Sequence, residues 1–286
     1  MSNTTTKVLA GCAVGCLMVV LALGGLAWMG YRWARTAAAE VVEAAERAED
    51  RLEAEYGLVR DFTPPADGRI AADRIEAFLA VRELMAPQRT SLNESVEALA
   101  PAAGRSGAVG GLRAARAGIS MAPRLLEFAK VRNEALLEVG MGPGEYAWIY
   151  WLAYYAWLGH PVGDSLLNDI MEERIESDSS MQMHIDGMDT EHMEWQLRRD
   201  LEAMLRNLEV EIAPNLERAE LMELVVSELA AIDADSGRMP WAEGLPEAFV
   251  VGFEPYRARF EESYSPATNP FELLQLGSGP HGVTLE

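Results

Sequence analysis

Cysteine is almost absent from this chain of 286 residues, and the two that occur, Cys12 and Cys16, lie in one apolar run near the N-terminus. Everything after that run therefore lacks a disulfide framework and a thiol nucleophile or thiolate metal site. Positive charge is scarce too: 24 basic residues stand against 45 acidic ones, giving a net charge of −21. A surface of this kind repels phosphate backbones, so the composition argues against a nucleic-acid partner.

Alternating strand patterns are also nearly absent, and the segment AFVVGF, residues 248–253, is the one short candidate for a strand. Apolar residues recur instead at helical spacing, which predicts a mainly α fold with a bundle-like soluble domain. The apolar stripes are Ile75, Phe78, Leu79 and Met85; Leu125, Leu126, Ala129, Leu136 and Leu137; Met193, Leu197, Leu201, Met204, Leu205 and Leu208; and Leu221, Met222, Val225, Leu229 and Ile232.

The N-terminal apolar run predicts a transmembrane helix over residues 8–30. No charged residue occurs from Val8 to Met29, and as a helix this stretch is roughly 33 Å long, enough to cross the hydrocarbon core. Leu9-Ala10-Gly11-Cys12 resembles a lipoprotein cleavage box, but the apolar core follows the cysteine instead of preceding it. Cleavage after Ala27 is a further alternative; we favour an uncleaved single-pass anchor in a bacterial cell membrane.

Two arguments about orientation disagree. Arg32 and Arg35 follow the apolar run and only Lys7 precedes it, which by the positive-inside rule places the large domain in the cytoplasm. A short tail before a long apolar core is, however, also the plan of a signal anchor. We expect an extracytoplasmic domain.

Helix breakers divide the rest of the chain. Residues 1–7 are a short tail, and residues 31–60 are rich in helix formers and predict a helical stalk that ends at DFTPPADG. An α-helical domain is expected over residues 61–235, with a mobile glycine-rich connection at 101–118. The proline-rich residues 236–286 predict a loop-rich C-terminal segment.

Aromatic residues are concentrated in GEYAWIYWLAYYAWLGH, residues 144–160. This apolar stretch is too short to span a bilayer, so it is a core helix, a helix lying in the membrane interface, or the wall of an aromatic ligand groove. Aromatic side chains occur on all sides of the helix, which favours the core. The residues concerned are Tyr146, Trp148, Tyr150, Trp151, Tyr154, Tyr155 and Trp157.

Four segments of this chain resemble a group of uncharacterised bacterial proteins with one predicted N-terminal membrane helix. These segments are GCAVGC, DFTPPADG, FLAVRE and MGPGEYAWIYWLAYYAWLGH, and the resemblance covers residues 8–160. It implies a membrane anchor; it implies no activity, cofactor or site residue.

A serine hydrolase is the alternative from the class of enzymes. Gly163-Asp164-Ser165-Leu166 resembles the nucleophile block of GDSL-type hydrolases, and Asp189 and His192 resemble their Asp-x-x-His block. The family places its serine after a β-strand and its histidine far downstream, whereas here an aromatic helix precedes Ser165 and the two blocks are close in sequence. The other interpretation is that Asp164 or Ser165 caps a helix.

Metal binding is a second alternative, in the segment MQMHIDGMDTEHMEW at residues 181–195. Thioether and imidazole groups suit Cu(I), but the two histidines form no short ligand pair and HExxH is absent. The candidate ligands are Met181, Met183, His184, Met188, His192 and Met193. Methionines at helical spacing are usually core residues, and Asp189 with Glu191 also suits the opening of a helix.

These observations predict a membrane-anchored, non-catalytic helical scaffold, adaptor or partner-binding protein of the bacterial envelope. We expect it to contact membrane lipid through residues 8–30 and to bind a protein partner that the sequence does not name. No cofactor is indicated.

Small side chains on one face of the predicted membrane helix lead to a test. Gly11 and Gly15 are four residues apart, and Cys12 and Cys16 lie beside them, so a second copy of the helix can approach closely. We expect Cys12 or Cys16 to crosslink a homodimer under mild oxidation in native membranes, seen as a doubled mass on non-reducing gels. Replacing Gly11 and Gly15 with leucine should abolish the crosslink while the protein stays in the membrane; an unchanged crosslink contradicts the packing.

Overall fold

The computed structural model describes residues 43–103, 108–161, 190–214, 216–266, 268–269 and 272. Of the described part, 77% is helical and none forms a strand, which confirms the mainly α prediction. The predicted membrane segment 8–30 and its packing face lie outside these residues. Among the described helices, none combines the length and the hydropathy needed to cross a bilayer.

The N-terminal half is a series of helices joined by short connections. A helix over residues 43–56 ends at Gly57, whose φ of 78° suits glycine. The elements that follow are η1 (Val59–Asp61), α2 (Ala72–Leu84), α3 (Ala86–Ala103) and α4 (Ala108–Val139). Met85 alone separates α2 from α3, and Pro87 follows at the start of α3, where a missing N–H is tolerated.

The second half begins with the aromatic segment. It comprises α5 (Pro143–Tyr150), which continues directly into the π-helix η2 (Trp151–Trp157). After it come α7 (Thr190–Ile212), η3 (Leu216–Arg218), α8 (Ala219–Ala234), α9 (Glu247–Phe253), η4 (Glu254–Tyr256) and α10 (Arg257–Ser263). α7 begins at Thr190. Asp189 lies outside the described residues, so its interpretation as the cap of this helix stays a prediction.

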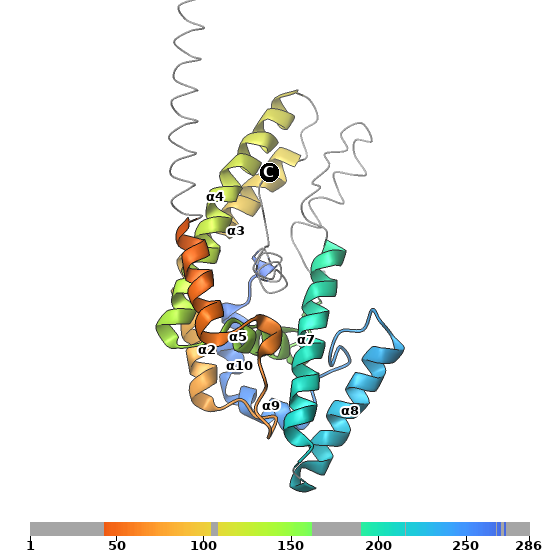
Figure 1. Ribbon diagram of the computed structural model, residues 1–286. Helices are drawn as coiled ribbons and strands as arrows, with labels where there is room; N and C mark the ends of the chain where they lie inside the picture. Colours follow the sequence, from red (N-terminus) through yellow and green to blue (C-terminus); the bar gives the residue numbers. More distant parts are fainter. Residues whose placement is uncertain are drawn as a thin grey trace, which may run out of the picture. The chain divides into compact units, whose positions relative to one another are not determined.

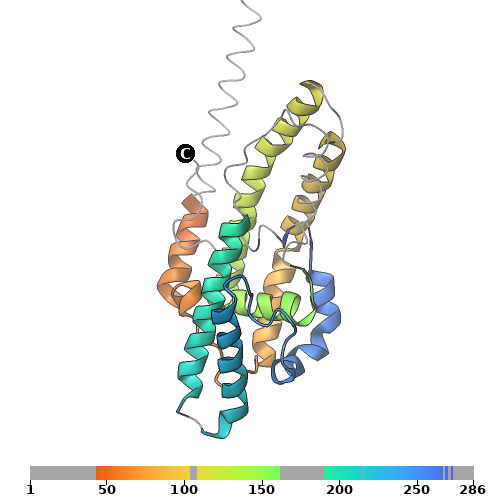
Figure 2. The same ribbon diagram turned by 90° about the vertical axis from the view of Figure 1, so that its right-hand side faces the viewer.

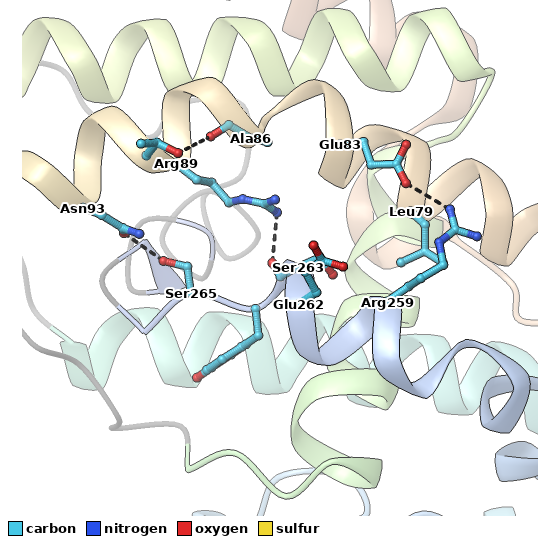
Figure 3. A pocket seen from close by; sticks show the side chains of 11 residues that line it. Leu79, Glu83, Ala86, Arg89, Asn93, Arg259, Glu262, Ser263 and Ser265 are labelled. Atoms are coloured by element: carbon cyan, nitrogen blue, oxygen red, sulfur yellow. Dashed lines mark hydrogen bonds and ion pairs between the residues drawn. The ribbon is translucent and has the colours of Figure 1, made fainter.

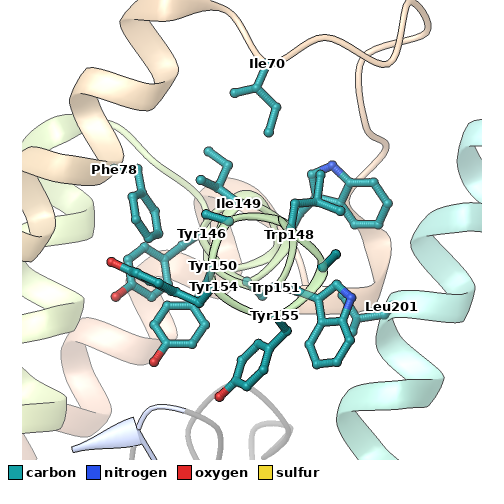
Figure 4. Packing of buried hydrophobic residues seen from close by; sticks show 14 of the residues in the cluster. Ile70, Phe78, Tyr146, Trp148, Ile149, Tyr150, Trp151, Tyr154, Tyr155 and Leu201 are labelled. Carbon is teal, nitrogen blue, oxygen red and sulfur yellow. The ribbon is translucent and has the colours of Figure 1, made fainter. Parts of the chain in front are cut away.

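The continuous helix formed by α5 and η2, here called the aromatic helix, is the centre of the core. Figure 4 looks along it and shows side chains projecting in all directions, toward Phe78 of α2 on one side and Leu201 of α7 on the other. A helix that is apolar all round must be covered all round. Gly144 lets its first turn approach η1, because a Cβ there would lie only 2.5 Å from the Val59 carbonyl oxygen.

Two antiparallel helix pairs flank this centre, α3 with α4 and α7 with α8 (Figures 1 and 2). α2 contacts α4 and α10, so helices distant in sequence surround the aromatic helix. Arg74 of α2 joins it to α5 by donating from Nε and Nη2 to the carboxylate of Glu145, at 2.7 and 2.5 Å. Such a bidentate pair fixes the orientation of the two helices.

The predicted apolar stripes are mostly confirmed. The stripe residues named in α2, and Met85 after it, are all buried. In α7 and α8 the buried stripe residues are Leu197, Leu201, Met204, Leu205 and Leu208, and Leu221, Val225, Leu229 and Ile232. α4 differs, since Phe128, Arg132 and Leu136 form its buried face while Leu125 and Leu137 are only partly covered. The buried face of α4 therefore contains a charged residue, Arg132, which a search for apolar stripes does not find.

The structure differs from three sequence interpretations, one strand candidate and two expected loop regions. AFVVGF is not a strand but part of α9, because Phe249 and Phe253, four residues apart, both pack into the core. The segment 236–286 is less loop-rich than predicted, since it contains α9, η4 and α10. The connection 101–118 is helical at 101–103 and 108–118. Each glycine in a helix costs about 1 kcal/mol relative to alanine, but alanine, leucine and arginine in this segment favour the helix. The packing of α3 against α4 stabilises it further.

Asp200 on α7 makes the stability of this fold depend on pH. Burial, partly offset by Arg60 and Arg199, raises its pKa to about 6 from an ordinary value of 3.8. The protonated form is therefore favoured in the folded state, and this contribution to stability is lost as pH rises through about 6.

We expect Asp200→Asn to gain stability relative to the wild type as pH rises from 4 to 7.5, because asparagine carries no charge to bury. The gain should be on the order of 1 kcal/mol, allowing for solvent screening. Thermal unfolding of the full chain in detergent at the two pH values measures it. An identical difference at both values contradicts the assignment.

Candidate functional site

Arg82 lies fully buried beside the aromatic helix, where an unpaired charge is costly. Its Nη1 donates to Tyr146 Oη at 3.0 Å and forms a short ion pair with Glu272, while Nη2 donates to the Ser263 carbonyl oxygen at 2.7 Å. The rings of Tyr150 and Tyr154 lie 5.3 and 5.5 Å from its guanidinium carbon. These contacts connect α2, the aromatic helix and the chain after α10.

The π-helical turn of the aromatic helix shapes the next layer of contacts. Tyr150 and Tyr155 both donate to Asn269 Oδ1, the former at 2.9 Å. Residues five apart point in different directions in an α-helix with 3.6 residues per turn, whereas the wider turn of a π-helix, with its i→i+5 hydrogen bonds, brings them closer to the same side. Leu245 N–H then donates to the Ala156 carbonyl oxygen at 2.9 Å, satisfying an acceptor near the end of this turn.

Burial controls the ionisation of these groups. Burial opposes the charge of Arg82, but the Glu272 carboxylate and the neighbouring phenols outweigh it and raise the Arg82 pKa. Burial also raises the pKa of Tyr146, Tyr150 and Tyr155, so these phenols stay neutral donors. Because Arg82 and Glu272 have no exposed surface, this network fastens the C-terminal segment to the core; it is not open to a ligand.

A pocket of about 490 Å³ opens next to this network, between α2, α3 and α10. We call it the Arg89 pocket, and Figure 3 shows its lining. It is formed by Leu79, Glu83, Ala86, Arg89, Thr90, Asn93, Arg259, Glu262, Ser263, Tyr264 and Ser265. Three helices build most of the walls, and Tyr264 and Ser265 directly follow α10. The positions of most lining side chains are therefore set by packed helices.

Arg89 projects from α3 into the space between the walls (Figure 3). Its Nη1 donates at 2.9 Å to the same Ser263 carbonyl oxygen that accepts from Arg82. Burial, together with the positive charge of Arg82, lowers the Arg89 pKa. Within the described part of the chain no carboxylate forms an ion pair with Arg89, unlike Arg82, which has Glu272.

The other polar groups of the pocket are engaged to different degrees. Arg259 is paired with Glu76 at 2.6 Å and with Glu83 at 3.0 Å. Ser265 Oγ donates to Asn93 Oδ1 at 2.8 Å, which leaves the amide nitrogen of Asn93 as a donor for other partners. Arg89 and Asn93 lie four residues apart on α3 and therefore face the same side.

The predicted aromatic site is part of the core. Tyr146, Trp148, Tyr150, Trp151, Tyr154 and Tyr155 are buried within one hydrophobic cluster, and Trp157 packs against it. Trp151 Nε1 donates to the Pro240 carbonyl oxygen at 2.8 Å, so even its polar atom has an internal partner. This burial matches the core interpretation and argues against an interface helix and an aromatic groove.

Most of the other predicted site residues lie outside the described part. Ser165 and Asp189 lie there, as do Met181, Met183, His184 and Met188, and the same holds for the side chains of His192 and Met193 on α7. The hydrolase and copper alternatives therefore stay predictions. Among described residues, no group of three or more histidines, cysteines and acidic residues is arranged to hold a metal ion.

Sequence reasoning missed the Arg89 pocket. Arg82 and Arg89 looked like ordinary charged positions on helices, and the only available signal was an arginine within the apolar stripe that contains Phe78, Leu79 and Met85. Comparisons with protein-family models, curated proteins and solved structures found no match. The interpretation of the pocket therefore depends on its own geometry.

The buried ion pair provides a test of what holds the C-terminal segment. Arg82→Met should destabilise the full chain by about 3 kcal/mol, because it leaves Glu272 buried without its counterion. Adding Glu272→Leu removes that lone charge, so the double variant should recover part of the loss. Thermal or urea unfolding in detergent measures both; strictly additive losses contradict the pairing.

Proposed function

We propose that this protein is a membrane-anchored, non-catalytic binding protein of the bacterial envelope, and that it receives a partner protein in the Arg89 pocket. The observation that carries the proposal is the pocket itself. Its volume of about 490 Å³ falls within the range of about 300–1,000 Å³ typical of ligand sites. The predicted anchor over residues 8–30 supplies the tether.

The fixed inner wall of the pocket supports a role in binding. The Ser263 carbonyl oxygen accepts from Arg82 and Arg89 at 2.7 and 2.9 Å, and Tyr154 Oη lies 2.7 Å from Ser263 Oγ. A partner that enters the pocket meets a surface already ordered by the core. Little entropy is then lost on binding, since these groups do not have to be ordered again.

The lining argues against catalysis by an activated hydroxyl. Thr90 Oγ1 donates to the Ala86 carbonyl oxygen at 3.0 Å, Ser263 Oγ to the Phe260 carbonyl oxygen at 3.1 Å, and Ser265 Oγ to Asn93. None of the 11 lining residues is a histidine. A serine or threonine nucleophile needs a base to accept its proton, and these three hydroxyls bind carbonyl, amide or phenol groups instead.

A pocket-filling variant tests the proposal. Thr90 is exposed on α3 and lines the pocket, so Thr90→Trp should fill the space. Val210 is 73% exposed on α7 and does not line the pocket, which makes Val210→Trp a matched control. We expect a partner protein to crosslink to, and co-purify with, both the wild type and Val210→Trp. The same partner should be absent from the Thr90→Trp sample. Thermal unfolding checks that both variants are folded; identical partners for all three proteins contradict the proposal.

A further inference from the structure

Arg89 has spare hydrogen-bonding capacity at the inner end of the pocket. A guanidinium carries five N–H donors, and in the described part of the chain its hydrogen bond to the Ser263 carbonyl oxygen is its one protein contact of this kind. Its other nitrogens are not among the buried polar atoms that lack a partner. They are therefore open to the pocket, where a ligand can reach them.

Two guanidinium groups meet at this point and only one is neutralised. Arg82 and Arg89 both donate to the Ser263 carbonyl oxygen, and the negative charge of Glu272 belongs to the pair with Arg82. The inner end of the pocket therefore has an excess of positive charge. A planar guanidinium matches a carboxylate with two parallel N–H···O bonds, and the amide nitrogen of Asn93 lies on the same face of α3.

The outer part of the pocket has the opposite character. Glu83 and Glu262 both line it, and Glu83 already pairs with Arg259. The whole chain carries a net charge of −21, which opposes the approach of a multiply charged anion. A ligand with a single negative charge suits this arrangement better than a phosphate dianion. Ala86, half-buried at the start of α3, offers apolar surface to the remainder of the ligand.

We propose that the Arg89 pocket binds a single carboxylate, either at the C-terminus of a peptide or on a small organic acid, through the Arg89 guanidinium and the Asn93 amide. The assignment rests on the proposed binding function and names the chemistry that the pocket recognises. The carboxylate lies against Arg89, and the chain or apolar group behind it extends toward α10.

Calorimetric titration of the full chain in detergent with matched probes tests the assignment. The probes are the peptide Ala-Ala-Ala-Leu with a free or an amidated C-terminus, N-acetylleucine with its amide, and inorganic phosphate. At least one carboxylate should bind about tenfold more tightly than its amide, a difference equivalent to about 1.4 kcal/mol. If only the peptide shows this difference, the source is a chain terminus; if N-acetylleucine shows it as well, a small acid suffices.

Variants assign the effect to Arg89. Arg89→Gln keeps a donor near Ser263 but removes the charge, so it should abolish the preference for the carboxylate over the amide. Arg206→Gln is the matched control, because Arg206 pairs with Glu202 and Asp233 and does not line the pocket. It should bind like the wild type.

Three results would overturn the assignment: equal binding of carboxylate and amide, an unchanged preference in Arg89→Gln, or phosphate binding as tight as that of the best carboxylate. If Thr90→Trp loses the partner but one of these three results is found, the proposed binding function is supported and only the assignment of a carboxylate ligand is wrong. Carboxylate binding in a protein whose partners are unaffected by Thr90→Trp would instead overturn the proposed partner function.

Discussion

The aromatic helix can be stable only if other parts of the chain cover it on every side. Each large aromatic side chain that leaves water contributes roughly 1.5–3 kcal/mol, and the buried ones of α5 and η2 point in all directions. Helices from both halves of the sequence and the chain around Trp241 supply the cover. The positions of α2, α7 and α10 follow from this requirement.

The tyrosine hydroxyls introduce polar groups into this apolar centre, and their partners come from the end of the chain. Tyr150 and Tyr155 share Asn269, and Tyr146 contacts Arg82 and Glu272. A buried phenol or guanidinium without a partner costs free energy. The described residues after α10 are therefore part of the core: the ring of Tyr264 packs against it, and Asn269 and Glu272 are held by polar contacts.

The pocket follows from the same network. The carbonyl oxygen of Ser263 is fixed by Arg82 from one side, and Arg89 reaches it from α3. One arginine is neutralised by the C-terminal segment, whereas the other keeps donors directed toward the space between α2, α3 and α10. A structural ion pair and the proposed binding surface thus share one carbonyl group, so a change in the position of Ser263 would alter the pocket.

The sequence alone determined the helical class, the interruption of the helices at DFTPPADG and the burial of the aromatic segment, because local spacing and helix breakers act between neighbouring residues. It offered AFVVGF only as a strand candidate, since a short apolar run suits a strand or a helix and the packing of Phe249 and Phe253 selects the helix. The π-helical turn, the pairing of Arg82 with Glu272 and the placement of Arg89 were decided by the tertiary structure. Arg82 and Glu272 are 190 residues apart, and a local sequence pattern does not predict which distant residue will pair with a buried charge.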